Sequence, residues 1–594
     1  MNNYPYTSEF YTINDIKKMY KNLEKYDYKK RLLYDRYYTI KNLKYNKYKY
    51  LFIGRPLIIL SEDSDYDDYN KIVDFFQNKE RMKCKLYRQK YSPIDYFIKY
   101  RKEIENQALQ KYKKISPYTI KETIYSLGYE CTSFRQTLLI TFIKMFNSKK
   151  ILDFSAGWGE RLLSSIFMDV FYTGIDPNIN LFEGYYKIID TFAKNKNKYT
   201  LINNTIQNVD LKNEMYDMVF TSPPYFDLEK YTDNNKQSIS QYTNEKEWTD
   251  NFLKPALKKS YDHLIIGGYM CININQKSKK ENYVDEMINY LYTFPDMYYY
   301  GVIGYSNKKI SNPQPIWIWR KYTTVPKELY NPPFVITNIK HNNINFNVIR
   351  DDYLIGGTKQ RGLVPLLETI QKDIFIYAGP VYGYAQIALA YSAFLTHKRA
   401  VIIVEKRNNL FPLTKYAKSF GAFVKEVPQP AYLEKIILYS KKFYEQDTNK
   451  RFLINFGTND DTFINFMKSN IKDAWGYMEH PNVIWMVAGS SVLLNILYDV
   501  FPNTYFNIVQ VGKTIWEDQM DTKRTKLYIS KEKFTNVEKK QPPYPTVSTY
   551  DAKLWDFFEK YGKNGDYIWN VGKDITFTPK KRISDIYKSS LSLS

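Results

Sequence analysis

Short apolar segments separated by glycine, proline and polar residues run through the chain from about residue 150 onward. Residues 149–162 combine a short apolar strand, a glycine turn and the start of a helix. Further strands are predicted, in order, at residues 170–175, 216–220, 264–274 and 314–321. The last of these alternates isoleucine and tryptophan with the two-residue period of a strand, and we expect its tryptophans to pack in a core. The pattern predicts a Rossmann-like α/β domain over residues 115–330.

A second series of apolar segments follows a proline-containing break at residues 331–334. It predicts strands and helices at residues 374–377, 385–393, 400–405 and 483–487. We therefore expect a second α/β domain over residues 340–565, followed by a C-terminal tail over residues 566–594. Residues 1–114 form an N-terminal region that we expect to be basic and mainly helical.

The segment Ser222-Pro223-Pro224-Tyr225 has the composition of a site that methylates an amino group on a nucleobase. Such an amine is a poor nucleophile because its lone pair is delocalised into the ring. The two prolines fix the backbone, so the Ser222 hydroxyl and the Pro223 carbonyl can be aimed as acceptors at one NH2 group. Tyr225 supplies a flat face on which a flipped base can stack. The alternative is an ordinary turn at the end of a strand.

A glycine turn upstream provides the context for a cofactor. Gly157 and Gly159 allow the backbone to come close to a ligand. The helix that follows them offers free N–H groups to a carboxylate. Asp176 ends the second strand 19 residues beyond Gly157, close to the spacing at which an acidic residue binds the hydroxyls of a ribose.

Together these residues resemble the nucleic-acid amino-methyltransferases that use S-adenosylmethionine, whose members carry a DPPY, NPPY or SPPY box. The resemblance covers about residues 115 to 325. It implies that Asp153, Ser155, Gly157 and Gly159 belong to the cofactor loop and that Asp176 is the ribose-binding acid. It also implies that the catalytic box consists of Ser222, Pro223, Pro224 and Tyr225. It also implies that Phe134 and Arg135 close over the methionine end of the cofactor. The SPPY form leaves adenine N6 and cytosine N4 both open as the target.

In the second half, Lys359 follows a Gly-Gly turn at the head of a predicted amphipathic helix. In an apolar pocket such a lysine has a lowered pKa and can react with a carbonyl group; otherwise it is an exposed residue of a lysine-rich chain. Residues 340–565 resemble fold type II (tryptophan synthase β-like) pyridoxal-phosphate enzymes related to aminocyclopropane-carboxylate deaminase and cysteine desulfhydrase. The resemblance implies that Lys359 binds pyridoxal 5'-phosphate covalently and that Gly489, Ser490 and Ser491 hold its phosphate group.

Two positions of the second half depart from that family. Thr358 stands where the family has the asparagine before the lysine, and Tyr382-Gly383-Tyr384-Ala385 replaces the Ser-Asn-His block that cradles the cofactor ring. The phosphate loop is also poor in glycine. We therefore expect the fold, and keep a working enzyme and a degenerate domain used for binding or architecture as alternatives.

The positive charge of the chain is concentrated near its N-terminus. The net charge is +23, which favours a polyanionic partner. Residues 1–150 hold 31 basic against 17 acidic residues, and residues 41–50 interleave tyrosine with lysine, which suits charge neutralisation and base stacking. Abundant Tyr, Lys, Asn and Ile are also typical of an AT-rich genome, such as that of a virus or phage. We expect a nucleic-acid partner, DNA rather than RNA, and treat the acidic residues 61–68 as a solvated loop.

Cysteines and histidines are few and scattered. The three cysteines show no CxxC spacing and the four histidines form no metal-ligand pair, so neither a disulfide framework nor a metal site is predicted. The N-terminus lacks the apolar core of a signal peptide, and no apolar run reaches transmembrane length. The sequence predicts a protein of the cytoplasm or another intracellular site, with no membrane partner.

Three functions of different classes follow from these patterns. The first is S-adenosylmethionine-dependent methylation of an exocyclic amino group of a nucleobase in DNA. The second is a pyridoxal-phosphate enzyme that acts on a small amino acid, or a bifunctional protein that modifies bases. The third is a non-catalytic nucleic-acid-binding protein, whose signature would be salt-sensitive binding without methyl incorporation.

Overall fold

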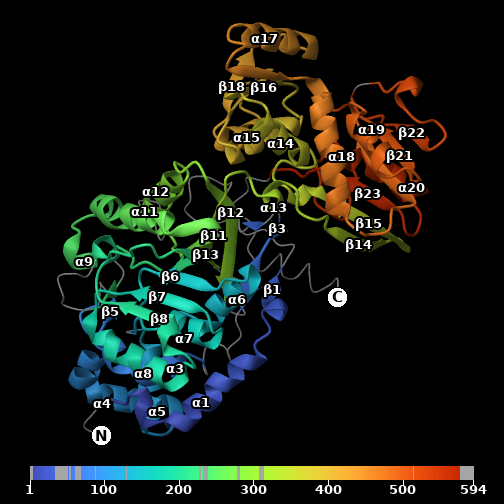
Figure 1. Ribbon diagram of the computed structural model, residues 1–594. Coiled ribbons are helices and arrows are strands. Elements are labelled where there is room, and N and C mark those ends of the chain that lie inside the picture. Colours follow the sequence, from blue (N-terminus) through green and yellow to red (C-terminus); the bar gives the residue numbers. More distant parts are fainter. Residues whose placement is uncertain are drawn as a thin grey trace. The chain divides into compact units, whose positions relative to one another are not determined.

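The computed structural model describes residues 4–33, 51–52, 55–60, 69–86, 89–128, 130–226, 229–231, 238–276, 281–306, 313–512 and 514–575. The chain divides into two compact units, which we call unit 1 (mainly residues 1–322) and unit 2 (mainly residues 323–594). Each unit combines helices with one or more sheets that contain parallel strands (Figure 1). The expected α/β fold of both halves is therefore confirmed.

Unit 1 is built on an 11-stranded sheet. Its main path consists, in spatial order, of β1 (Leu32–Leu33), β4 (Ile58–Leu60), β12 (Met297–Ser306), β13 (Gln314–Lys321), β11 (Leu264–Asn273), β9 (Tyr216–Thr221), β6 (Lys150–Asp153), β7 (Phe171–Ile175) and β8 (Tyr199–Ile202). The strands from β11 to β8 pair in parallel, whereas β13 is antiparallel to both β11 and β12. The short strands β2 (Leu51–Phe52) and β3 (Arg55–Pro56) lie off this path.

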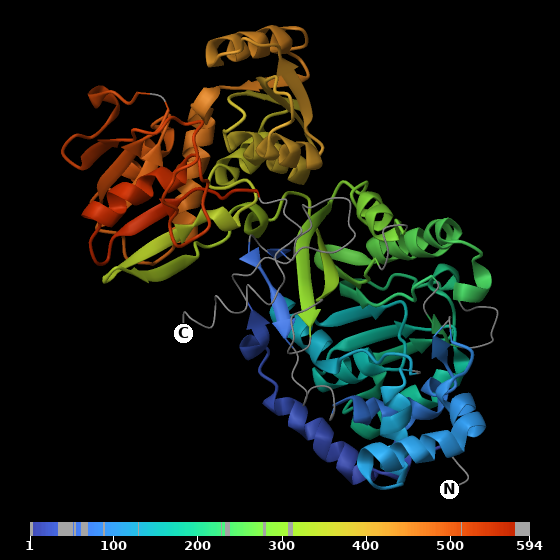
Figure 2. The ribbon, with the colours of Figure 1, turned by 180° about the vertical axis from the view of Figure 1, so that it is seen from behind.

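Two groups of helices cover the sheet of unit 1. One group contains α6 (Gln136–Phe146), α7 (Glu160–Phe167) and α8 (Phe182–Phe192), and the other contains α11 (Lys254–Asp262) and α12 (Tyr283–Leu291). Figures 1 and 2 show the two groups on opposite sides of the strands. The shorter helices α9 (Ser238–Gln241) and α10 (Glu245–Trp248) precede α11. Trp317 and Trp319 are fully buried in this unit, which confirms their expected place in a core.

The N-terminal part of unit 1 is mainly helical, as expected. It contains α1 (Ile13–Asn22), α3 (Tyr69–Arg81), α4 (Pro93–Tyr112) and α5 (Pro117–Ser126). Helices α1, α4 and α5 each begin with a reciprocal side-chain cap, formed by Thr12 with Asp15, Ser92 with Asp95, and Ser116 with Thr119. Helix α3 packs against α7 and α8, and β4 pairs with β12. Residues on both sides of position 114 thus belong to one compact unit.

Unit 2 contains two sheets. A four-stranded parallel sheet consists of β18 (Phe423–Val427), β17 (Arg399–Glu405), β16 (Ile374–Ala378) and β19 (Arg451–Ile454). A six-stranded sheet consists of β14 (Ile336–His341), β15 (Ile344–Arg350), β23 (Tyr567–Asn570), β20 (Val483–Ala488), β21 (Tyr505–Gln510) and β22 (Thr525–Ile529). Among the described strands of the six-stranded sheet, β14 and β15 form an antiparallel hairpin and the other neighbouring strands pair in parallel. The strands expected at residues 374–377, 400–405 and 483–487 are confirmed.

The helices of unit 2 are α13 (Lys327–Tyr330), α14 (Gln360–Thr369), α15 (Ala385–Leu395), α16 (Pro412–Ser419), α17 (Leu433–Glu445), α18 (Asp461–Trp475), α19 (Val492–Val500) and α20 (Trp555–Tyr561). Helix α14 packs against both α15 and α18, and α18 packs against α19. Helix α15 confirms the helix expected at residues 385–393. Every residue of α15 is buried, because this helix is covered by α14, α16 and two strands.

Within the described residues, no helix has both the length and the apolar character needed to cross a bilayer. Cys84, Cys131 and Cys271 are all buried and none forms a disulfide. In the same part of the chain, no three histidine, cysteine or acidic side chains gather in a way that would hold a metal ion.

Candidate functional site

The candidate site of unit 1 lies where the strand order of the parallel sheet reverses. Strand β6 pairs with β7 on one side and with β9 on the other, so the chain leaves β6 and β9 at neighbouring positions on one edge. Ligands of open α/β sheets bind at the carboxyl ends of strands at such a switch point. A cavity of about 410 Å³ lies here and is lined by residues from the loops after β6, β7 and β9, among them Ser155, Gly157, Asp176, Ser222, Pro223, Pro224 and Tyr225.

The glycine loop after β6 is shaped by two left-handed residues. Gly157 has φ +61° and donates its N–H to Asp176 Oδ2 at 3.0 Å, while the Tyr185 hydroxyl donates to the Gly157 carbonyl. Gly159 has φ +103°, and a Cβ there would lie 3.2 Å from the Tyr185 ring. Gly157 lines the cavity, whereas Gly159 lets helix α8 approach the loop from behind.

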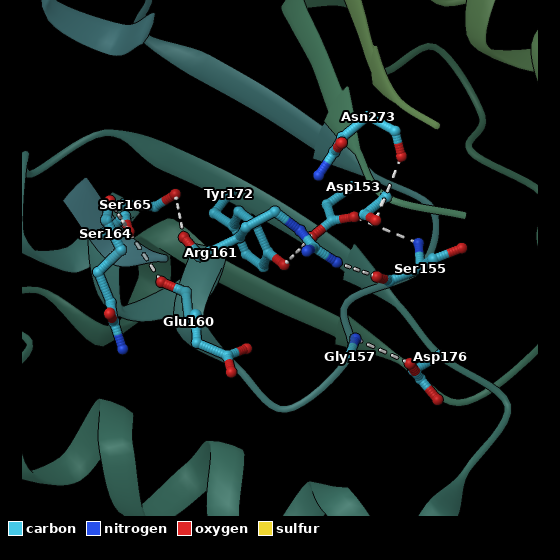
Figure 3. A network of polar contacts seen from close by, with 12 residues as sticks. Asp153, Ser155, Gly157, Glu160, Arg161, Ser164, Ser165, Tyr172, Asp176 and Asn273 are labelled. Atoms are coloured by element: carbon cyan, nitrogen blue, oxygen red, sulfur yellow. Dashed lines mark hydrogen bonds and ion pairs between the residues drawn. The ribbon is translucent and has the colours of Figure 1, made fainter. Parts of the chain in front are cut away.

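A buried ion pair supports the loop from below. Asp153 Oδ2 accepts hydrogen bonds from Arg161 Nε at 2.6 Å and from the Tyr172 hydroxyl at 2.7 Å. Asp153 Oδ1 accepts from the Ser155 N–H at 3.2 Å, and the Arg161 guanidinium also donates to the Ser155 carbonyl (Figure 3). Asp153 is fully buried and is absent from the cavity wall. Its place is therefore behind the glycine loop, where it fixes Arg161 and Ser155.

Asp176 ends β7 and lines the cavity. Its two carboxylate oxygens accept backbone N–H groups, Oδ2 from Gly157 and Oδ1 from Asn178, each at 3.0 Å. Burial raises the pKa of Asp176 to about 6. The carboxyl group is thus held in a fixed orientation at the end of the second strand.

The Ser-Pro-Pro-Tyr segment follows β9 and is anchored to the next strand of the sheet. The Ser222 hydroxyl donates to the Asn273 carbonyl at 3.3 Å, so its lone pairs remain available as acceptors. The Tyr225 hydroxyl accepts the Asn275 N–H at 3.0 Å, and Asn275 Nδ2 donates to Gln314 Oε1 at 3.1 Å. Strands β11 and β13 therefore fix the orientation of the serine and the tyrosine.

Phe134 and Arg135 precede helix α6. Phe134 lines the cavity, and its ring faces the Arg161 guanidinium at 4.9 Å. Arg135 does not line the cavity. The structure thus brings Phe134, but not Arg135, to the site.

Several residues of the site were not expected from the sequence. Glu160, Arg161, Asn273, Tyr305 and Gln314 all line the cavity. Glu160 and Arg161 directly follow Gly159, so their position next to the glycine loop could have identified them as site residues from the sequence. The other three come from β11, β12 and β13, and only the pairing of these strands brings them to the box.

The segment after the box reaches back to the N-terminal part of the chain. Residues 41–50 and 61–68 lie outside the described residues. Strand β10 (Glu229–Lys230) pairs with β5 (Lys85–Leu86). Tyr231 lines the cavity, and its carbonyl accepts from Cys84 Sγ at 2.9 Å. Residues near α3 thus hold one wall of the site.

Unit 2 contains a second cavity, of about 510 Å³, and Lys359 lines it. Lys359 is the residue before α14 and is partly buried. Burial lowers the pKa of Lys359 to about 8. Among the described residues no acidic group forms an ion pair with it, so the desolvated ammonium is uncompensated.

Gly489, Ser490 and Ser491 line the same cavity, between β20 and the first turn of α19. Ser491 has φ +55°, a left-handed conformation, and the Ser491 hydroxyl donates to the Ser490 carbonyl at 2.7 Å. The structure therefore brings Lys359 and the expected phosphate loop together. The free N–H groups of a helix start are suited to an anion.

The two departures from the family have clear places in this cavity. Thr358 Oγ1 accepts from Trp569 Nε1 at 3.1 Å, so this side chain is turned into the core. The Tyr384 hydroxyl donates to the Ile355 carbonyl at 3.2 Å, and a Cβ on Gly357 or Gly572 would lie 3.2 or 3.0 Å from the Tyr384 ring. Tyr384 thus occupies space that two glycines leave open.

Comparisons with known proteins bear on both units. No protein-family model matches the chain. A segment of 89 residues, 15% of the chain, is 39% identical to the Type II methyltransferase M.MjaVI of Methanocaldococcus jannaschii, and the chain spans 43% of the length of that relative. This likeness confirms the resemblance of the chain to a methyltransferase.

Two solved structures are similar to part of the chain. One is an ACC deaminase homologue, with 15% identity and a TM-score of 0.36, covering 45% of this chain and 95% of that one. The other is an O-acetylserine-dependent cystathionine β-synthase from Helicobacter pylori, with 15% identity and a TM-score of 0.33, covering 44% of this chain and 98% of that one.

Proposed function

We propose that unit 1 transfers a methyl group from S-adenosylmethionine to an exocyclic amino group of a nucleobase in DNA. One observation carries the proposal: the glycine loop with Gly157, the acid Asp176 at the end of β7 and the segment Ser222–Tyr225 line a single cavity. A cofactor site and an amine-binding site that share one cavity are the arrangement that direct transfer requires, because the two reacting groups must meet in line.

The cavity is suited to the cofactor in both size and charge. Its volume of about 410 Å³ lies in the range of small-molecule sites. Asp176 presents a fixed carboxyl group to a pair of ribose hydroxyls, and Gly157 leaves room for the chain of the cofactor beside the loop. When bound, S-adenosylmethionine supplies a methyl group on a positively charged sulfur.

The box binds and orients the amine. The Ser222 hydroxyl has its hydrogen committed to the Asn273 carbonyl, so toward a bound base it acts only as an acceptor. The Pro223 carbonyl is the second acceptor, and together they draw the amine hydrogens into hydrogen bonds. Tyr225, whose hydroxyl is held by the Asn275 N–H, offers its ring to a base turned out of the duplex.

Charge supports a nucleic-acid substrate. Residues 1–150 hold 31 basic against 17 acidic residues, and most of this segment belongs to the same compact unit as the cavity. Such an excess attracts a phosphate backbone whatever its sequence. The identity of the labelled nucleoside distinguishes adenine N6 from cytosine N4 as the target.

The proposal is tested by incubating the full chain with labelled S-adenosylmethionine and separate DNA and RNA substrates of mixed sequence. Digestion to nucleosides then identifies the labelled base. We expect label in N6-methyladenine or N4-methylcytosine of DNA. Salt-sensitive DNA binding without any label would instead favour the non-catalytic interpretation.

A second candidate function, a pyridoxal-phosphate enzyme acting on a small amino acid, rests on unit 2. The desolvated Lys359 and the Gly489–Ser491 turn line one cavity of about 510 Å³, which suits a carbonyl-bearing phosphate ester. Lys359 would bond the cofactor, and the backbone N–H groups around Ser491 would hold its phosphate. When bound, pyridoxal phosphate supplies an electron sink for amino-acid chemistry.

This candidate is tested with a spectrum. The full chain, mixed with pyridoxal phosphate and separated from the excess, is expected to keep a visible absorption band, and Lys359→Ala is expected to lose it. Lys415→Ala, at an exposed lysine of α16, is the matched control. An unchanged band in Lys359→Ala would remove the assignment.

A further inference from the structure

Glu160 is a buried acid at the wall of the unit 1 cavity. It is the first residue of α7, only 1% of its surface is exposed, and it lines the same cavity as Asp176 and the Ser222 box. Among the described residues no side chain donates a hydrogen bond to its carboxyl group and none forms an ion pair with it. Burying an ionised carboxyl group without such a partner costs free energy. The place of Glu160 at a cavity wall therefore points to a ligand that supplies the missing partner.

The neighbouring arginine does not fill this role. The Arg161 guanidinium is committed to Asp153 Oδ2 at 2.6 Å and to the Ser155 carbonyl, and it faces the Phe134 ring. Figure 3 shows the Glu160 and Arg161 side chains leaving the helix in different directions. Among the described residues of the cavity wall, Arg161 is the only basic one and is neutralised by Asp153, whereas Glu160 and Asp176 are both acidic. The cavity therefore favours a ligand with positive charge.

We propose that Glu160 binds the α-ammonium group at the amino-acid end of S-adenosylmethionine. This inference rests on the proposed function, because it assigns a contact inside the same cofactor site. Asp176 serves the ribose end and Glu160 serves the amino-acid end, so the two acids fix the cofactor at two separate points. Glu160 is thus a positioning residue that keeps the sulfur in line with the amine held at Ser222.

Glu160 affects which end of the cofactor's amino-acid group the start of α7 can bind. A free helix start would attract the cofactor's carboxylate through its N–H groups. Here Glu160 already places a carboxyl group at that position, so a second carboxylate would meet like charge. The ammonium group of the same amino-acid end is the complementary partner. If Glu160 only interacted with the helix dipole, it would not favour ligands with an ammonium group over ligands without one.

Two neutral-sulfur ligands separate these roles. S-adenosylhomocysteine carries the amino-acid end, and 5'-methylthioadenosine lacks it while keeping the ribose and adenine. Calorimetry on the full chain is expected to show that Glu160→Gln weakens S-adenosylhomocysteine binding about 10- to 100-fold, the loss typical of a charge-assisted hydrogen bond. Binding of 5'-methylthioadenosine is expected to stay unchanged. Asp176→Asn is expected to weaken both ligands, and Glu183→Gln, at an exposed acid of α8, neither.

Each outcome decides one point. Tighter binding of S-adenosylhomocysteine to Glu160→Gln would mean that Glu160 faces the carboxylate, and unchanged binding would leave it a helix-dipole partner; either result overturns the inference while the proposed function stands. Equal weakening of both ligands would make Glu160 a structural residue and also overturns it. Absence of binding of either ligand to the unmodified chain would overturn the proposed function itself.

Discussion

The cavities of the two units differ in how their polar groups are held. In unit 1 the functional groups are fixed by hydrogen bonds: Asp176 by two backbone N–H groups, Ser222 by the Asn273 carbonyl, and Tyr225 by the Asn275 N–H. In unit 2 the key group is a single desolvated ammonium, that of Lys359, with no acidic partner among the described residues. The first cavity therefore holds several polar groups in fixed orientations, whereas the second contains one desolvated lysine.

This difference shows which evidence identifies each site. Direct methyl transfer needs two bound groups in line, so its signature is the meeting of two loops at one switch point. Covalent binding of a carbonyl compound needs a neutral amine, so its signature is a lowered lysine pKa.

The largest effect is expected from the box. Ser222→Ala and Tyr225→Ala are each expected to lower methyl incorporation by about 100-fold or more, because an aimed acceptor or a stacking face is lost. Binding of S-adenosylhomocysteine is expected to persist in both. Ser222→Asn, which restores an acceptor oxygen, is expected to recover most of the activity, and Tyr186→Ala, at an exposed tyrosine of α8, is the control. Full turnover in both alanine variants would refute the role of the box.

The ion pair behind the glycine loop is expected to have a large effect on stability. Arg161→Met leaves Asp153 buried without its cation and is expected to cost about 3–5 kcal/mol of unfolding free energy. Lys187→Met breaks an exposed pair with Glu183 and is expected to cost less than about 1 kcal/mol. Urea unfolding of the full chain measures both. Equal costs for the two variants would show that the loop does not depend on this pair.

The lysine of unit 2 is expected to show a distinct pH profile. Because burial lowers the pKa of Lys359 to about 8, the Lys359 amine is neutral in about half of the molecules near pH 8. A lysine with the ordinary pKa of about 10.4 is then less than about 1% neutral, so Lys359 is expected to react roughly 100-fold more readily. Reduction after mixing with pyridoxal phosphate, followed by peptide mass analysis, locates the label. The yield at Lys359 is expected to rise through pH 8 and then level off; uniform labelling of all lysines would contradict this.

The smallest effect is a pH dependence at Glu160. Burial raises the pKa of Glu160 to about 7, with Arg161, Asp74 and Arg81 as the charged groups around it. The ionised form binds an ammonium group, so the affinity for S-adenosylhomocysteine relative to 5'-methylthioadenosine is expected to rise about tenfold between pH 6 and pH 8. The ratio cancels the titration of Asp176, which both ligands share. A ratio independent of pH would count against the Glu160 contact.

Local features of the candidate sites were accessible from the sequence. The glycine loop, the 19-residue spacing from Gly157 to Asp176 and the box at Ser222 are each contained in one strand and its following turn. Local spacing fixes such features because a strand must end where its turn residues begin. The position of Lys359 after a Gly-Gly turn is of the same kind, and its neighbours in the sequence are also its neighbours in space.

Local spacing in the sequence was enough to identify the loops that line the two cavities, whereas the side chains that surround these loops depend on tertiary packing. Asn273 and Gln314 reach the box because β11 and β13 are adjacent in the sheet, and strand order is not encoded in local periodicity. The burial of Asp153 behind the loop follows from side chains packed around α7, and so does the absence, among the described residues, of a side-chain partner for the Glu160 carboxyl group. Burial and pairing are long-range properties, and they set both the pKa values and the charge of each cavity.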